Sequence, residues 1–102
     1  MTVLQQIKRA VFSGKIEFTE KAAMDLEHDD LVEQDVIESI VYAKGISKTM
    51  RSTSVGRQHR RERLHVIIGV NLAGTLIYSK GKFVEERGTG RYYVLVSAKR
   101  AD

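Results

Sequence analysis

The chain of 102 residues contains no cysteine, no proline and no tryptophan. Without cysteine it can form no disulfide, no thiol-based catalytic centre and no cysteine-ligated zinc site. Its three scattered histidines argue against a histidine-rich metal site. The sequence has no apolar run of the ~18 residues that a membrane span needs, and residues 1–6 lack the apolar core of an export signal. We therefore expect a cytoplasmic protein with no metal, no other cofactor and no membrane partner.

Length and composition indicate a single folded domain over residues 1–102. Hydrophobic residues make up 42% of the chain and charged residues 29%, proportions typical of a globular protein and not of a disordered one. A chain of this size buries enough surface to fold without disulfides, but it has no room for a second core.

Charge is distributed unevenly along the chain. Residues 1–40 hold four lysines and arginines against nine acidic residues, a net charge of −5, whereas residues 41–102 hold thirteen against four, a net charge of +9. Such asymmetry predicts a polyanion-binding surface on the C-terminal part. The acidic residues of the N-terminal part match no calcium-loop pattern and are expected to be solvated.

Periodicity divides the chain near Gly45. Before it, apolar residues recur every three or four positions, which predicts three helices: one from Val3 to Phe12 with a stop at Gly14, one after Thr19 as N-cap, and one from Val32 to Val41. Residues 15–18 are expected to be an extended connection. The pattern therefore places the helices before any main strand.

After Gly45 the period becomes two, which predicts strands over 46–52, 63–71 and 91–99. Another strand starts at Thr75 and either continues past Gly81 to Glu85 or turns back at Lys80–Gly81. Short turns between consecutive strands imply antiparallel pairing. The expected fold is α+β, with N-terminal helices packed on one face of a C-terminal antiparallel sheet. We expect the helix-facing side of the sheet to carry Leu64, Val66, Ile68, Val94 and Val96.

The densest group of functional residues is the run from Arg57 to His65. It holds four arginines and two histidines: Arg57, Arg60, Arg61, Arg63, His59 and His65. Arginine pairs bidentately with phosphate and histidine transfers protons near neutral pH. The run therefore predicts RNA binding, or RNA cleavage by the 2′-hydroxyl with no metal. A basic loop that only attracts phosphate is the alternative.

A second candidate group lies on the predicted strands. It comprises Lys48, Tyr78, Lys80, Arg91 and Lys99. Cations and a tyrosine on one sheet face can stabilise a pentacovalent phosphate and stack a base. Lysines that protect a sheet edge and a tyrosine that caps the core are the alternative interpretation. We expect Lys48, His65, Tyr78, Arg91 and Lys99 to converge on one exposed face as a catalytic site, with Lys80 and the arginine run binding RNA.

Several segments together resemble the motility quorum-sensing regulator toxins. The resemblance rests on the opening helix Leu4–Ile16 and on three strand motifs, Ser47–Met50, Ile77–Lys80 and Val96–Lys99. Segments Phe18–Ala22 and Gln34–Ile40 are similar to uncharacterised bacterial domains related to the RelE and BrnT toxins, and Ser97–Ala101 is similar to the BrnT ending. The sequence differs from that family in two places. The family's active glutamine falls in the region of the run from Arg57 to His65, where only Gln58 lies nearby, and the segment 81–90 is longer than the family's pattern predicts.

The resemblance implies a RelE-like fold and a small basic ribonuclease of a type II toxin–antitoxin system. It further implies metal-independent cleavage of messenger RNA and neutralisation by a cognate antitoxin protein. By position, Lys48, Tyr78 and Lys99 match the family's functional lysine, tyrosine and lysine. Two other functions stay open on the residues alone: a non-catalytic RNA- or ribosome-binding module, and a protein-interaction domain that uses its basic face.

Overall fold

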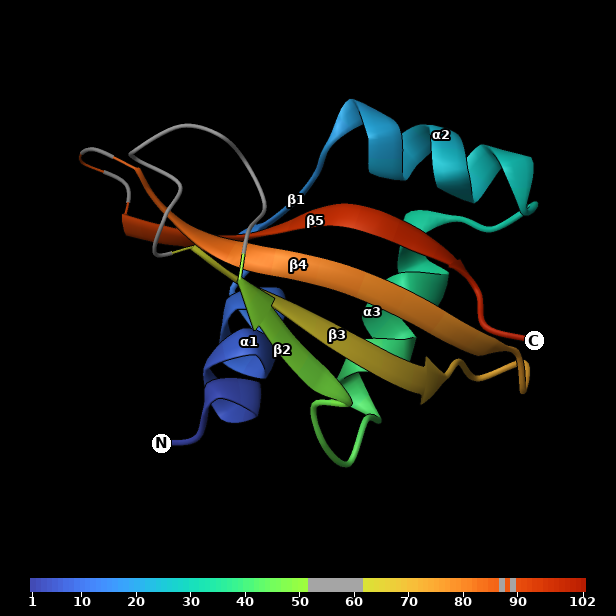
Figure 1. The fold of residues 1–102 in the computed structure, drawn as a ribbon, viewed down its shortest axis with the longest axis horizontal. Coiled ribbons are helices and arrows are strands. Elements are labelled where there is room, and N and C mark those ends of the chain that lie inside the picture. Colours follow the sequence, from blue (N-terminus) through green and yellow to red (C-terminus); the bar gives the residue numbers. More distant parts are fainter. Residues whose placement is uncertain (52–61, 87, 89) are drawn as a thin grey trace.

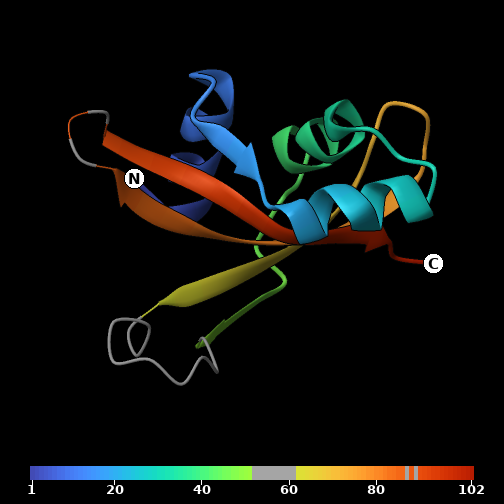
Figure 2. The same ribbon diagram turned by 90° about the horizontal axis from the view of Figure 1, so that it is seen from above.

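A computed structural model of the chain describes residues 1–51, 62–86, 88 and 90–102, and shows helices against one face of a five-stranded sheet (Figures 1 and 2). The helices are α1 (Val3–Phe12), α2 (Glu20–His28) and α3 (Glu33–Val41). The strands are β1 (Ile16–Phe18), β2 (Lys48–Arg51), β3 (Arg63–Val70), β4 (Leu76–Glu86) and β5 (Gly90–Arg100). The expected α+β class, with helices preceding the main strands, is confirmed.

Local sequence signals account for the helix boundaries. Thr2 and Gln5 form a reciprocal capping box at the start of α1, with the Gln5 amide donating to Thr2 Oγ1 over 3.1 Å. The predicted cap Thr19 accepts a hydrogen bond from the Ala22 amide, also over 3.1 Å. Gly14 ends α1 with a φ of +73°, a left-handed conformation that favours glycine. None of the helices in the described part of the chain is long and apolar enough to cross a membrane.

The sheet order is β1-β5-β4-β3-β2, and one of its pairs differs from expectation. The strands after Gly45 pair antiparallel, as predicted, but residues 16–18 form β1, which pairs parallel to β5. The prediction of a wholly antiparallel sheet was therefore wrong at the edge formed by β1. The Tyr93 amide donates to Lys15 O over 2.9 Å and the Thr19 amide donates to Leu95 O over 3.0 Å. Backbone bonding of the short extended segment to β5 thus makes the sheet mixed.

Strand β4 resolves the open alternative at Gly81. It continues past Gly81 to Glu86, with a register shift between Lys80 and Gly81. Lys80 lies opposite Ser97 and Gly81 lies opposite Leu95, so Val96 is the extra residue of a bulge on β5. Beyond β1, α2 lies beside this half of β5 (Figure 1), where Ser97 Oγ donates to Asp25 and the Arg100 amide donates to Asp29.

The expectation about which sheet face meets the helices was wrong. The buried core contains Ile67 of β3 and Tyr93 and Leu95 of β5, the alternate positions to those predicted. Ile68 and Val70 are 42% and 46% exposed on the opposite face. Leu64, Val66 and Val94 share that face by strand alternation, and Val96 is the bulge residue. Both faces of β3 carry apolar residues, so a period of two could not distinguish them.

Two glycines explain the choice of face. A Cβ at Gly69 would lie 2.2 Å from the backbone oxygen of Ser39 in α3, so the helix packs directly on this glycine. A Cβ at Gly81 would lie 2.6 Å from the Tyr93 ring, so the ring covers this glycine. Only a residue without a side chain permits either contact, and both glycines lie on the helix-facing side of the sheet.

We predict that Gly69→Ala destabilises the fold by about 1–3 kcal/mol, the usual cost of forcing a methyl group into a filled site. Ser39 O is a backbone atom, so relief requires α3 to shift. The measurement is urea denaturation followed by circular dichroism. Gly45→Ala is the matched control, because a Cβ at Gly45 meets nothing within 4 Å. Equal midpoints for the two variants would contradict this account of the packing.

Candidate functional site

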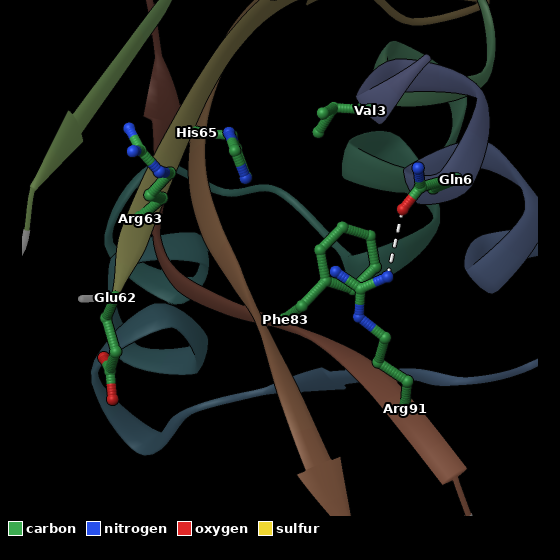
Figure 3. A pocket seen from close by; sticks show the side chains of 7 residues that line it. All are labelled: Val3, Gln6, Glu62, Arg63, His65, Phe83 and Arg91. Carbon is green, nitrogen blue, oxygen red and sulfur yellow. Dashed lines mark hydrogen bonds between the residues drawn. The ribbon is translucent and has the colours of Figure 1, made fainter. Parts of the chain in front are cut away.

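A hollow of about 420 Å³ opens between α1 and the β3-β4-β5 part of the sheet, at the end of the sheet nearest α1 (Figure 3). We call it the His65 pocket. It is formed by Val3 and Gln6 of α1 with residues of the sheet and its margin, namely Glu62, Arg63, His65, Phe83 and Arg91. Three of the predicted site residues, Arg63, His65 and Arg91, therefore meet here, although they come from two strands that are not neighbours in the sheet.

His65 lies in the wall of this pocket and is only 6% exposed. It is opposite Thr49 on β2 and Gly81 on β4, and its Nδ1 is 3.2 Å from Thr49 Oγ1. If Nδ1 carries the proton, it donates to the threonine hydroxyl and leaves the Nε2 lone pair available to a ligand. Burial, reinforced by the charges of Arg63 and Arg91, lowers the pKa of His65 below 6.5. The ring is therefore neutral at physiological pH.

Arg91 is held in place by contacts with two other elements. Its guanidinium carbon lies 3.8 Å from the centre of the Phe83 ring, and its Nη1 donates to Gln6 Oε1 over 3.0 Å (Figure 3). A planar cation stacked on an aromatic ring keeps its N–H edge directed sideways, where it can bind an oxyanion. Its Nε is also 3.7 Å from Glu85, a pair too exposed to neutralise it firmly.

Aromatic rings form the floor behind these polar groups. The His65 and Phe83 ring centres are 6.4 Å apart, and the Phe83 and Tyr93 ring centres are 5.2 Å apart, both edge to face. Tyr93 is fully buried, and within the described part of the chain its hydroxyl has no hydrogen-bond partner. Burial raises the pKa of Tyr93, so the phenol stays protonated. The floor is thus apolar and keeps the histidine in a low-dielectric environment.

The remaining predicted residues of the described strands lie on the other side of the sheet. Val66 is opposite both Lys48 and Lys80, and Tyr78 is opposite both Ile68 and Lys99, which places all of them on the face away from the helices. We call this the open face. Lys99 Nζ lies 5.2 Å from the centre of the Tyr78 ring. Among the cations here, Lys82 is paired with Glu62 over 2.8 Å.

The predicted convergence of five catalytic residues on one face was therefore wrong. His65 and Arg91 face the helices, whereas Lys48, Tyr78 and Lys99 occupy the open face, because neighbouring residues of a strand point to opposite sides. Of the arginine run, Arg63 lies at the margin of the His65 pocket. Five residues of that run fall outside the described part of the chain: the predicted site residues Arg57, His59, Arg60 and Arg61, and Gln58.

The sequence patterns did not indicate the other four lining residues, which are Val3, Gln6, Glu62 and Phe83. Their contributions depend on contacts between distant parts of the chain, such as the bond from Arg91 to Gln6, and no spacing pattern reveals these. Within residues 1–51, 62–86, 88 and 90–102, no group of three histidine, aspartate or glutamate side chains is arranged to hold a metal ion. The chemistry open to the pocket is anion binding and proton transfer by a neutral histidine.

The lowered pKa of His65 predicts a pH dependence of stability. The unfolded state, with a pKa near 6.5, binds the proton more readily than the folded state, so the free energy of unfolding falls as pH drops below 6.5 toward the folded pKa. We expect His65→Asn to remove this part of the slope. The measurement is urea denaturation between pH 5 and pH 8. His28→Asn is the control, because the His28 side chain is 89% exposed and its Nδ1 pairs with Asp29 at the surface over 3.2 Å, so this variant should keep the fall in stability below pH 6.5.

Comparison with known proteins adds no assignment. The chain matches no protein-family model, no curated protein and no solved structure among those compared. The resemblance to the RelE-like toxins therefore depends on the short motifs of the sequence, and what the pocket does is argued from its own geometry.

Proposed function

We propose that the protein is a metal-independent endoribonuclease and that the His65 pocket is its active site. One observation carries this proposal: a neutral, buried histidine lies in the same hollow as the oriented guanidinium of Arg91, with Arg63 at the margin. A neutral imidazole accepts a proton and a guanidinium stabilises a charged phosphate, and these are two of the three requirements of cleavage by a 2′-hydroxyl, the third being an acid for the leaving oxygen.

His65 would act as the general base. Its Nε2 takes the proton of the ribose 2′-hydroxyl while the 2′ oxygen attacks the adjacent phosphorus. Arg91 stabilises the extra negative charge of the five-coordinate phosphorane, and because Phe83 and Gln6 already hold the guanidinium, little reorganisation is needed. The departing 5′ oxygen, on the opposite side of the phosphorus, takes a proton from water, and the imidazolium releases its proton to solvent. The products are a 2′,3′-cyclic phosphate and a 5′-hydroxyl, and DNA, which lacks the nucleophile, is not cut.

The biological setting follows from the sequence resemblance. We propose a messenger RNA interferase of a toxin–antitoxin system, acting in the cytoplasm and neutralised by an antitoxin protein. The thirteen lysines and arginines after residue 40 support an RNA partner.

A second candidate function is RNA binding without cleavage, on the open face. The observation that favours it is the pair Tyr78–Lys99, with Lys80 and Lys48 one row away on the same face. A half-buried ring beside several ammonium groups suits a stacked base and its phosphates. In this alternative the His65 pocket has no catalytic role.

We predict that the purified protein cuts a mixed-sequence RNA in EDTA and that His65→Gln slows cleavage by about 10²–10⁴-fold, the usual contribution of a positioned base. A strand with deoxyribose at the cut position should resist. His28→Gln, on an exposed histidine of α2, is the matched control and should retain the wild-type rate. Circular dichroism melting verifies that each variant is folded.

Two outcomes would overturn the assignment. If the wild type, with or without ribosomes, binds RNA but cuts none, the open-face function replaces the nuclease. Lys80→Gln and Lys99→Gln should then each lower the log–log salt slope of binding by about 0.7. If cleavage occurs but His65→Gln keeps the full rate, the catalytic site lies elsewhere.

The pH profile gives an independent test of the arginine. Arg91 helps to keep the pKa of His65 below 6.5, so kcat/KM should fall only in acid below that value. Arg91→Gln removes a nearby positive charge, and the acidic limb should move to higher pH in addition to the loss of rate. Arg100→Gln, at the far end of β5, is the control for the lost charge. If the acidic limb of the pH profile does not move in Arg91→Gln, Arg91 does not act on the pKa of the catalytic base.

A further inference from the structure

A second hollow adjoins the His65 pocket along α1. It has a volume of about 310 Å³ and shares Gln6, Phe83 and Arg91 with that pocket. Its other lining residues come from the chain's start, from α1 and from the segment after it: Met1, Arg9, Ala10, Ser13 and Lys15. We call it the Arg9 hollow. The hydrogen bond from Arg91 to Gln6 joins β5 to α1 between the two spaces, so Arg91 borders both.

Three of the eight residues that line the Arg9 hollow are cations, and none of these eight described residues carries a carboxylate. Arg9 is in the last turn of α1 and is exposed. Lys15 follows the left-handed Gly14, and its Nζ lies 3.0 Å from the position of a Cβ on Gly90, beside the start of β5. With Arg91 this makes three positive side chains around a space whose wall includes the Phe83 ring.

Resting on the proposed function, we infer that single-stranded RNA passes from the His65 pocket across Arg91 into the Arg9 hollow. The scissile phosphate lies between His65 and Arg91, and the phosphate of the neighbouring nucleotide lies between Arg9 and Lys15. The shared wall of Gln6, Phe83 and Arg91 makes the two spaces continuous, as a chain of nucleotides requires. A flexible polyanion fits better than a protein segment because both hollows are small and each is bordered by positive side chains.

The test uses two double variants with the same loss of charge. Arg9→Gln with Lys15→Gln removes the cations of the Arg9 hollow. Lys21→Gln with Lys44→Gln, both at exposed positions outside the two hollows, is the control. The probe is a fluorescent eight-nucleotide RNA with 2′-O-methyl groups, which prevents cleavage. Anisotropy titrations over a range of salt concentrations give the affinity and the salt slope.

The Arg9/Lys15 variant should bind the eight-nucleotide strand at least 10-fold more weakly, and its salt slope should fall by about 1.4, two single-strand phosphate contacts. The control should change the slope far less. Equal losses in the two double variants would overturn the inference, since only net charge would then matter. A second result would also overturn the inference: the Arg9/Lys15 variant no longer binds inorganic phosphate as a competitor but keeps full RNA affinity. The hollow would then hold a small anion only.

A minimal substrate separates this inference from the nuclease itself. A dinucleoside monophosphate has one phosphate, so it reaches His65 and Arg91 but places nothing between Arg9 and Lys15. The Arg9/Lys15 variant should cut it at the wild-type rate and cut the longer unmodified strand more slowly at low concentration. A matching loss on both substrates would overturn the second subsite. If the wild type cuts neither substrate, the nuclease fails while the binding comparison still decides the RNA track.

Discussion

The close packing of α3 on β3 at Gly69 is the contact on which the rest of the structure depends. Ser39 O would lie 2.2 Å from a Cβ at this position, so the helix lies this close to the strand only because position 69 carries no side chain. Once that side is covered, strand alternation assigns the residues of β3, β4 and β5 to one face or the other, with a change of phase in β5 at the Val96 bulge. His65 lies four positions before Gly69 and therefore on the same side of β3. It is thereby placed beneath the helices and loses most of its contact with water.

The covered face creates an unusual electrostatic environment for a basic protein. His65, Arg63 and Arg91 lie around one hollow, where burial and two positive charges oppose protonation of the imidazole. The cost of keeping the ring neutral is small, because a neutral histidine is already the major species at pH 7. The cations on the open face lie on the opposite side of the sheet from this hollow. The sheet thus divides the basic residues into two groups with different chemistry.

Arg91 joins the pocket to the rest of the fold. It belongs to β5, stacks on Phe83 of β4 and donates to Gln6 of α1, so three elements determine its position. The aromatic series from His65 through Phe83 to Tyr93 continues this packing into the core, where the Tyr93 ring covers Gly81. A guanidinium held in this way stands at the boundary of two neighbouring hollows and can face a ligand in either one.

The sequence by itself determined the local elements and the charge asymmetry. Thr19 caps α2 with its side-chain oxygen, and Gly14 ends α1 in a left-handed conformation, as the sequence predicts. The change of period near Gly45 marks the passage from helices to main strands. It also pointed to His65 and Arg91 as functional candidates. Only tertiary structure decided which face of β3 is covered, that residues 16–18 join β5 in parallel, and that Gln6 and Phe83 complete the site. The reason is physical: apolar residues occupy both sides of β3, and the contacts that select one side join residues far apart in the chain.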